Sequence, residues 1–188
     1  MNDRPAFLDK LSPNLARLFV AVCEHEAAHA VVAHVLGVPV LKVEVLADCS
    51  RGPAGLAHTF PLGWLSGGGL RKRVRADLLN RLAGPAANAP ALTSSSTADS
   101  DFPVSRRLLR YYGARLPGGA PYTIGELLRD ARAILRRPVV AAMHEAVTAA
   151  LLPEWSLGGH EVHALARRAH RRFRRERRRV VNDRTPEI

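Results

Sequence analysis

The residues best suited to chemistry are two histidines and a glutamate, in the order His25-Glu26-Ala27-Ala28-His29. This HExxH pattern lies in an apolar stretch that predicts a helix rather than a loop. At about 100° per residue, the two histidines lie roughly 40° apart around the helix axis, so both imidazoles can reach one metal ion. The glutamate beside them can act as a general base on water. The pattern is therefore typical of a zinc site that hydrolyses peptide bonds.

Two other interpretations compete with catalysis. The histidines can be core residues satisfied by hydrogen bonds, or they can hold a metal that only stabilises the fold. Chance is a poor explanation, because the composition yields this pattern only roughly 0.02 times per chain. A glutamate buried in an apolar helix is costly without a partner charge, which favours the catalytic interpretation.

A catalytic zinc ion needs a third protein ligand and one position left for water. The metzincin pattern requires glycine at position 32 and histidine at position 35, where this chain has Val32 and Val35. His34 does not replace that ligand, because it follows His29 by five residues and lies about 140° from it around the helix. The metzincin arrangement is therefore excluded.

A buried helix and a hairpin are the elements expected around the motif. Apolar residues at spacings of three and four predict a helix over Leu15–Leu36, which ends at Gly37. Alternating apolar and polar residues predict a strand over Val40–Leu46, and Ala54–Phe60 can return beside it after a glycine-proline turn.

The rest of the chain is predicted to be helical. Thr93–Ser100 is polar and loop-like, and Ser100 or Asp101 can cap a helix that starts near Pro103 and stops at Gly113. The other expected helices cover Leu70–Leu82, Thr123–Leu135, Pro138–Leu152 and a last segment from about His160. These elements predict a mostly helical α+β domain with a small β-hairpin.

Composition and charge limit the class of protein. The 188 residues are 47% hydrophobic and 24% charged, which indicates one globular domain and excludes a disordered or rod-like chain. The net charge is +11, and Arg167–Arg179 contributes nine arginines and one glutamate, a net charge of +8. We therefore expect a nearly neutral domain over residues 1–166 and an arginine-rich tail over residues 167–188.

We expect a cytoplasmic protein without a membrane span. The most apolar stretch, Leu18–Val40, is interrupted by glutamates and histidines, and the first ten residues do not resemble a secretion signal. Cys23 and Cys49 are the only cysteines in the sequence, and we expect both to be reduced thiols without a chemical role.

Residues 19–36, FVAVCEHEAAHAVVAHVL, resemble the active-site helix of FtsH-type ATP-dependent zinc metalloproteases. Four later segments resemble parts of the same protease domain in the same order: its hairpin (residues 40–45 and 55–56), its LAGRAAEE helix (LAGPAA, residues 82–87), its GASNDLxxAT segment (residues 98–108) and its final helices (residues 133–165). Because many zincins share HExxH alone, the ordered set of segments is the more specific signal. The resemblance covers most of residues 15–166.

This resemblance implies a zincin-like fold and a zinc metalloendopeptidase. It implies that His25, His29 and Asp101 are the zinc ligands, since Asp101 aligns with the aspartate of the family's Asn-Asp pair. Asp99 is the alternative third ligand. Glu26 is the implied general base.

Two departures from the family pattern affect the expected function. Asn88 stands where the family has a glutamate, so one support of the active site differs. The ATPase half is missing, because none of the three lysines follows a glycine as a phosphate-binding loop requires. We therefore expect substrates that are unfolded polypeptides or are delivered by a separate AAA ATPase, and an extended peptide can add to the hairpin edge. Assembly into an oligomer is compatible with the sequence.

Two further patterns that contain histidine have weaker signals. His144 and Glu145 resemble the start of the zinc motif, but position 148 is threonine, so we interpret them as a coincidence on an amphipathic helix. His160 and His163 are three residues apart and can chelate a metal. No cysteine or further histidine lies nearby in the sequence, which favours a solvated helix face.

Two alternative functions follow from other parts of the sequence. The chain can be a catalytically retired zincin that serves as a binding module, although intact His25, Glu26 and His29 weigh against this. Arg167–Arg179 can bind nucleic acid, another polyanion or anionic lipid, or it can be a solvated tail. Phe173 is the only aromatic residue there, which argues against stacking on single-stranded bases.

Overall fold

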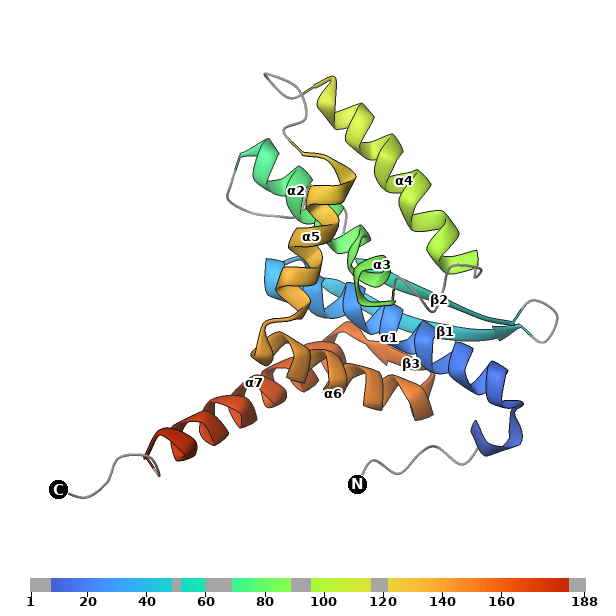
Figure 1. Cartoon of the computed structure of the whole chain (residues 1–188), viewed down its shortest axis with the longest axis vertical. Coiled ribbons are helices and arrows are strands. Elements are labelled where there is room, and N and C mark those ends of the chain that lie inside the picture. The colour runs from blue at the N-terminus through green and yellow to red at the C-terminus, as the bar shows by residue number, and fades with distance from the viewer. Residues whose placement is uncertain (1–7, 49–51, 60–68, 89–95, 116–121, 183–188) are drawn as a thin grey trace.

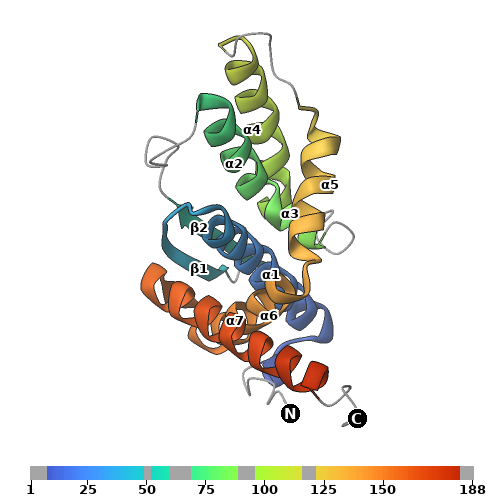
Figure 2. The same ribbon diagram turned by 90° about the vertical axis from the view of Figure 1, so that its left-hand side faces the viewer.

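A long apolar helix lies at the centre of the computed structural model, between two groups of helices and beside a small sheet (Figures 1 and 2). The structure describes residues 8–48, 52–59, 69–88, 96–115 and 122–182. The elements in these ranges are a 3-10 helix (Leu8–Lys10), α1 (Pro13–Leu36), β1 (Val40–Asp48), β2 (Gly52–Thr59), α2 (Leu70–Arg81), α3 (Ala83–Asn88), α4 (Ser96–Gly113), α5 (Ile124–Leu135), α6 (Pro138–Glu154), β3 (Ser156–Gly158) and α7 (Gly159–Asn182). The prediction of a mostly helical α+β domain is confirmed.

Both ends of α1 carry strong local signals. The Ser12 hydroxyl accepts a hydrogen bond from the backbone N–H of Leu15 at 3.3 Å, and Pro13 occupies the first helical position. Gly37 ends the helix with φ of 74°, a left-handed conformation that favours glycine. The motif helix is therefore set by its own sequence at both ends.

The length and composition of α1 are also those of a membrane-spanning helix. Of its most apolar 18-residue stretch, 72% is buried inside the fold. Helices α3 and α6 and both strands of the hairpin pack around it. Burial by these neighbours accounts for its apolar composition, as in the core helix of a globular domain.

The predicted hairpin is present and belongs to a three-stranded antiparallel sheet with the order β2-β1-β3. Val43 lies opposite Ala57 of β2 and Leu157 of β3, and its side chain is buried against the core. The sequence analysis missed β3, because three residues are too short to show an alternating pattern. In the described part of the chain, β2 pairs only with β1, so it is an edge strand.

The start of α4 differs from the prediction. The helix begins at Ser96, so residues 96–100 are helical rather than a loop, while residues 93–95 lie outside the described part of the chain. Pro103 is inside the helix, and Asp101 is therefore in its second turn and not at its cap. Serine, threonine and aspartate are weak helix formers, and proline favours the first turn, which misled the prediction. Contacts of α4 with α2, α3 and β2 override this local preference.

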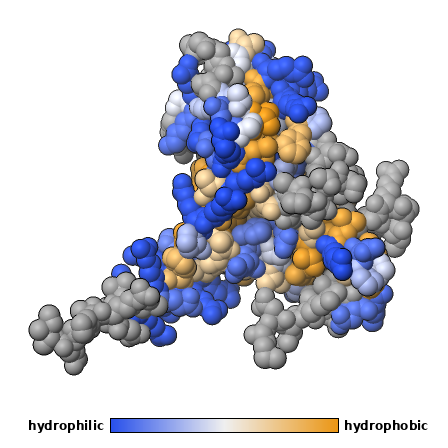
Figure 3. Space-filling view, in the orientation of Figure 1, coloured by the Kyte–Doolittle hydropathy of each residue, from blue (hydrophilic) through white to orange (hydrophobic). Residues whose placement is uncertain are grey.

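Helix α7 crosses the expected boundary between domain and tail without a break. Its first turns pack on α6 and β1, where Val162 and Ala166 are buried. Beyond Ala166 the arginines are exposed, while Ala169 and Phe173 are half-buried. The outer half of α7 points away from the body, and its surface is largely hydrophilic (Figures 1 and 3).

Candidate metal centre

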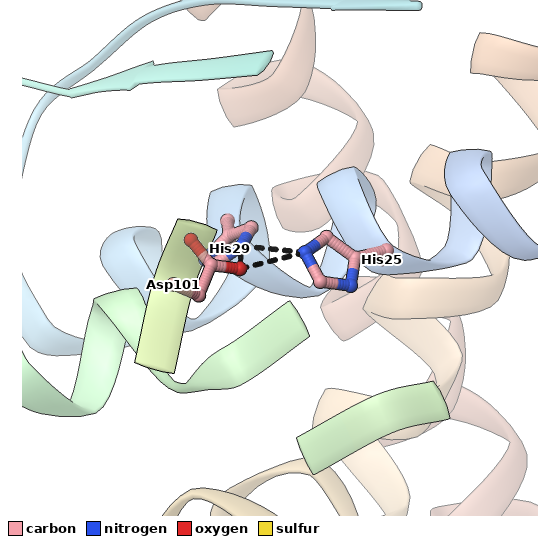
Figure 4. Close-up of side chains that lie close together, drawn as sticks. All are labelled: His25, His29 and Asp101. Atoms are coloured by element: carbon pink, nitrogen blue, oxygen red, sulfur yellow. Dashed lines mark hydrogen bonds and ion pairs between the residues drawn. The ribbon is translucent and has the colours of Figure 1, made fainter. Parts of the chain in front are cut away.

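Three side chains from two helices converge at one point: His25 and His29 from α1, and Asp101 from α4 (Figure 4). Nε2 of His25 lies 2.9 Å from Oδ2 of Asp101 and 3.2 Å from Nε2 of His29. Oδ2 of Asp101 also lies 3.3 Å from Nε2 of His29, so the three donor atoms form a triangle. Zinc ligands at about 2.0–2.1 Å in tetrahedral geometry are about 3.3 Å apart. The triangle thus fits one face of a tetrahedral ion and leaves the fourth position open.

Helical spacing brings the two histidines to this point, whereas packing between distant helices brings the aspartate there. His25 and His29 are one helical turn apart on the buried face of α1, with exposed fractions of 1% and 8%. Asp101 comes from a helix 76 residues later in the chain and is 22% exposed. The structure therefore brings together all three residues expected to bind the metal. The side chain of Asp99 lies outside the described part of the structure.

A hydrogen bond from α1 to α2 sets the tautomer of His29. Its Nδ1–H donates to the backbone carbonyl of Asn80 at 2.6 Å, which turns Nε2 toward Asp101 and makes Nε2 the nitrogen available to a metal. The amide of Asn80 in turn donates to the hydroxyl of Thr59 at 3.2 Å, so β2 is tied to the same support. Sequence analysis missed Asn80, because a backbone carbonyl leaves no signal in the residue type.

The charges of the cluster suit a cation. Burial acts to raise the pKa of Asp101, but hydrogen bonds from His25 and His29 outweigh it and hold this pKa at about 2. Burial lowers the pKa of His25, which favours its neutral form. For His29, burial also acts to lower the pKa, but the hydrogen bond with Asp101 and the charge of Glu26 raise it overall. Because a metal displaces that proton, metal affinity must fall in acid.

Glu26 lies beside the cluster but is not part of the triangle. Its side chain is 3% exposed, packs against Gly55 of β2 and accepts a hydrogen bond from the backbone N–H of Ala57. Burial raises its pKa to about 7. A carboxyl group that titrates near neutral pH is suited to accept and return a proton.

Two glycines allow the backbone to approach these side chains closely. A Cβ at Gly84 of α3 would overlap the imidazole of His25, and a Cβ at Gly55 would overlap the side chain of Glu26. Sequence analysis did not identify either glycine as part of the site. The small residues around Gly84 were the available signal, since they permit close packing of α3 on α1.

We predict that Gly84→Ala displaces the His25 ring and weakens metal binding at least ~10-fold, since even supporting contacts of metal ligands contribute 10-fold or more. The overpacking is also expected to destabilise the protein by about 1–3 kcal/mol. Metal content and thermal unfolding measure the two effects. Gly125→Ala is the matched control, because a Cβ there meets no atom closer than 4.0 Å. Equal metal content in the two variants would contradict the proposed close packing.

The metal cluster and Glu26 border the same hollow, which has a volume of about 250 Å³. His58 and Thr59 of β2 and Arg81 of α2 also line it. No motif marked these three residues, because only the folded chain brings the end of β2 beside the end of α2. The hollow gives a small ligand simultaneous access to the three converging donor atoms and to the carboxyl group of Glu26.

His144 and Cys23 are not part of the candidate metal centre. Nε2 of His144 donates to the backbone carbonyl of Glu24 at 2.8 Å, so this histidine joins α6 to α1 and is not part of the metal cluster. Burial raises the pKa of the Cys23 thiol to about 12, which makes it inert at neutral pH. Cys49 and the side chain of Asn88 lie outside the described part of the structure.

Comparison with known proteins adds no family assignment. No protein-family model matches this chain, and no curated protein matches it significantly.

Proposed function

We propose that this protein is a zinc metalloendopeptidase with a zincin-like fold, in which His25, His29 and Asp101 hold the ion and Glu26 is the general base. The observation that carries this proposal is the triangle of donor atoms, 2.9 to 3.3 Å on each edge, in the same hollow as a buried glutamate. The ordered resemblance to FtsH-type protease domains supports the same assignment. The ATPase half of that family has no counterpart in this sequence.

When bound, zinc supplies a Lewis acid that lowers the pKa of water and stabilises negative charge on the carbonyl oxygen. Glu26 accepts the proton of the attacking water on its carboxylate. The same carboxyl group then returns the proton to the amine that leaves. The hydrogen bond from Ala57 and the packing on Gly55 hold the carboxyl group in place during both transfers.

The substrate is an extended, unfolded polypeptide. Residues 55–59 of β2 line the hollow, and in the described structure this strand pairs with β1 alone. An extended peptide can add to its edge and place a peptide bond next to the cluster. Folded proteins do not present such a strand, so they require prior unfolding or delivery by a separate AAA ATPase.

Removal and return of zinc test this function. Treatment with a chelator is expected to abolish cleavage of casein, and one equivalent of Zn²⁺ per chain is expected to restore it without nucleotide. Unfolding should be monitored in the same samples, so that loss of activity is separated from loss of fold. Cleavage that persists in metal-free, folded protein would refute the proposal. The same conclusion would follow from zinc-loaded protein that cleaves no unfolded substrate.

A further inference from the structure

A second group of histidines lies at the C-terminal end of α1. Nδ1 of His34 is 2.9 Å from Nδ1 of His163 in α7, and the two rings meet edge to face with centroids 4.6 Å apart. His34 and His163 border a hollow of about 400 Å³. His160, one turn earlier in α7, also lines this hollow. None of these three histidines lines the other hollow, which is bordered by His25 and His29.

We propose that His34 and His163 form a second site for a divalent transition-metal ion such as Zn²⁺, in a hollow that His160 also lines. Imidazole nitrogen is a preferred ligand of Zn²⁺, Ni²⁺ and Cu²⁺. Two nitrogens bound at about 2.0–2.1 Å are about 2.9 Å apart at a right angle and about 3.3 Å apart at a tetrahedral angle. The observed 2.9 Å falls at the lower end of this range and equals the shortest edge of the first cluster.

The charge around His34 favours a neutral ligand but limits the affinity. Burial lowers the pKa of His34, and the nearby charges of His163, Arg167 and His170 lower it further. A neutral imidazole has the free lone pair that a metal requires. Among the described residues, no carboxylate comparable to Asp101 lines this hollow, and the positive charge of Arg167 repels a cation. The second ion therefore binds more weakly than the first.

The ion would join parts of the chain that are far apart in sequence. His34 and His163 are separated by 129 residues, and each belongs to a different helix. A bound ion fastens the base of the arginine-rich α7 to the end of α1. The role inferred for this site is structural, and it does not rest on the proposed peptidase function.

Equilibrium dialysis against Zn²⁺, followed by metal analysis of the full chain, tests the site. Wild type is expected to bind two ions, and His34→Gln and His163→Gln are each expected to weaken the second ion at least ~10-fold. His170→Gln is the matched control, because His170 is exposed on α7 and does not line the hollow. Thermal unfolding confirms that each variant is folded; His163 is exposed, so its substitution leaves the core intact.

Asp101→Ala separates the two sites. It is expected to keep the ion that His163→Gln loses, whether or not the first cluster binds zinc for catalysis. The proposal is overturned if wild type and both histidine variants bind the same number of ions. It is also overturned if His170→Gln loses the same ion, since the ligands would then lie elsewhere on α7.

Discussion

Replacement of Glu26 by glutamine is expected to reduce peptide hydrolysis by ~10²-fold to 10⁴-fold, the effect typical of removing a general base. The substitution is nearly isosteric, so the packing against Gly55 is retained. The amide cannot accept the proton of the attacking water. Because Glu26 lies outside the triangle of donor atoms, zinc content is expected to remain that of wild type.

The assay compares cleavage of casein at neutral pH with zinc content measured in the same samples. Glu24→Gln is the matched control, because Glu24 is on the same helix two residues away and does not line the hollow. Equal cleavage by wild type and Glu26→Gln would show that the assigned base is wrong. If both proteins bind zinc and neither cleaves, a binding module becomes the better description.

Replacement of Asp101 by alanine is expected to remove most of the zinc from the first site. The loss should exceed the ~10-fold to 100-fold effect of losing a supporting contact, because an anionic ligand itself is removed. Asp101 is also the hydrogen-bond partner of both histidines, so the variant leaves two buried imidazoles without their common acceptor. Zinc affinity, measured by competition with a chromogenic chelator, gives the size of the effect.

Asp99→Ala is the control for this experiment, because Asp99 is the other carboxylate that the sequence pattern offers as third ligand. It is expected to retain zinc. If Asp99→Ala loses the ion and Asp101→Ala keeps it, the third ligand has been assigned to the wrong residue. If both variants keep it, neither aspartate is a ligand.

The motif helix and the hairpin could be predicted because their signals are local. The spacing of His25 and His29 places two imidazoles on one face of any helix, and Ser12 and Gly37 set the ends of that helix. The start of α4 could not be predicted in this way. Its first residues favour caps and turns in isolation, and contacts with distant elements make them helical.

The sequence by itself determined that two histidines and a neighbouring glutamate share one helix, because that arrangement depends only on residues four or fewer positions apart. Only the tertiary structure decided which groups complete the site. Asp101 meets the histidines across 76 residues, and the Asn80 carbonyl orients His29 across 51. His34 and His163, dismissed separately as ligands in the sequence, meet across 129 residues. Helical periodicity places side chains only within one helix, whereas packing between helices decides which faces meet.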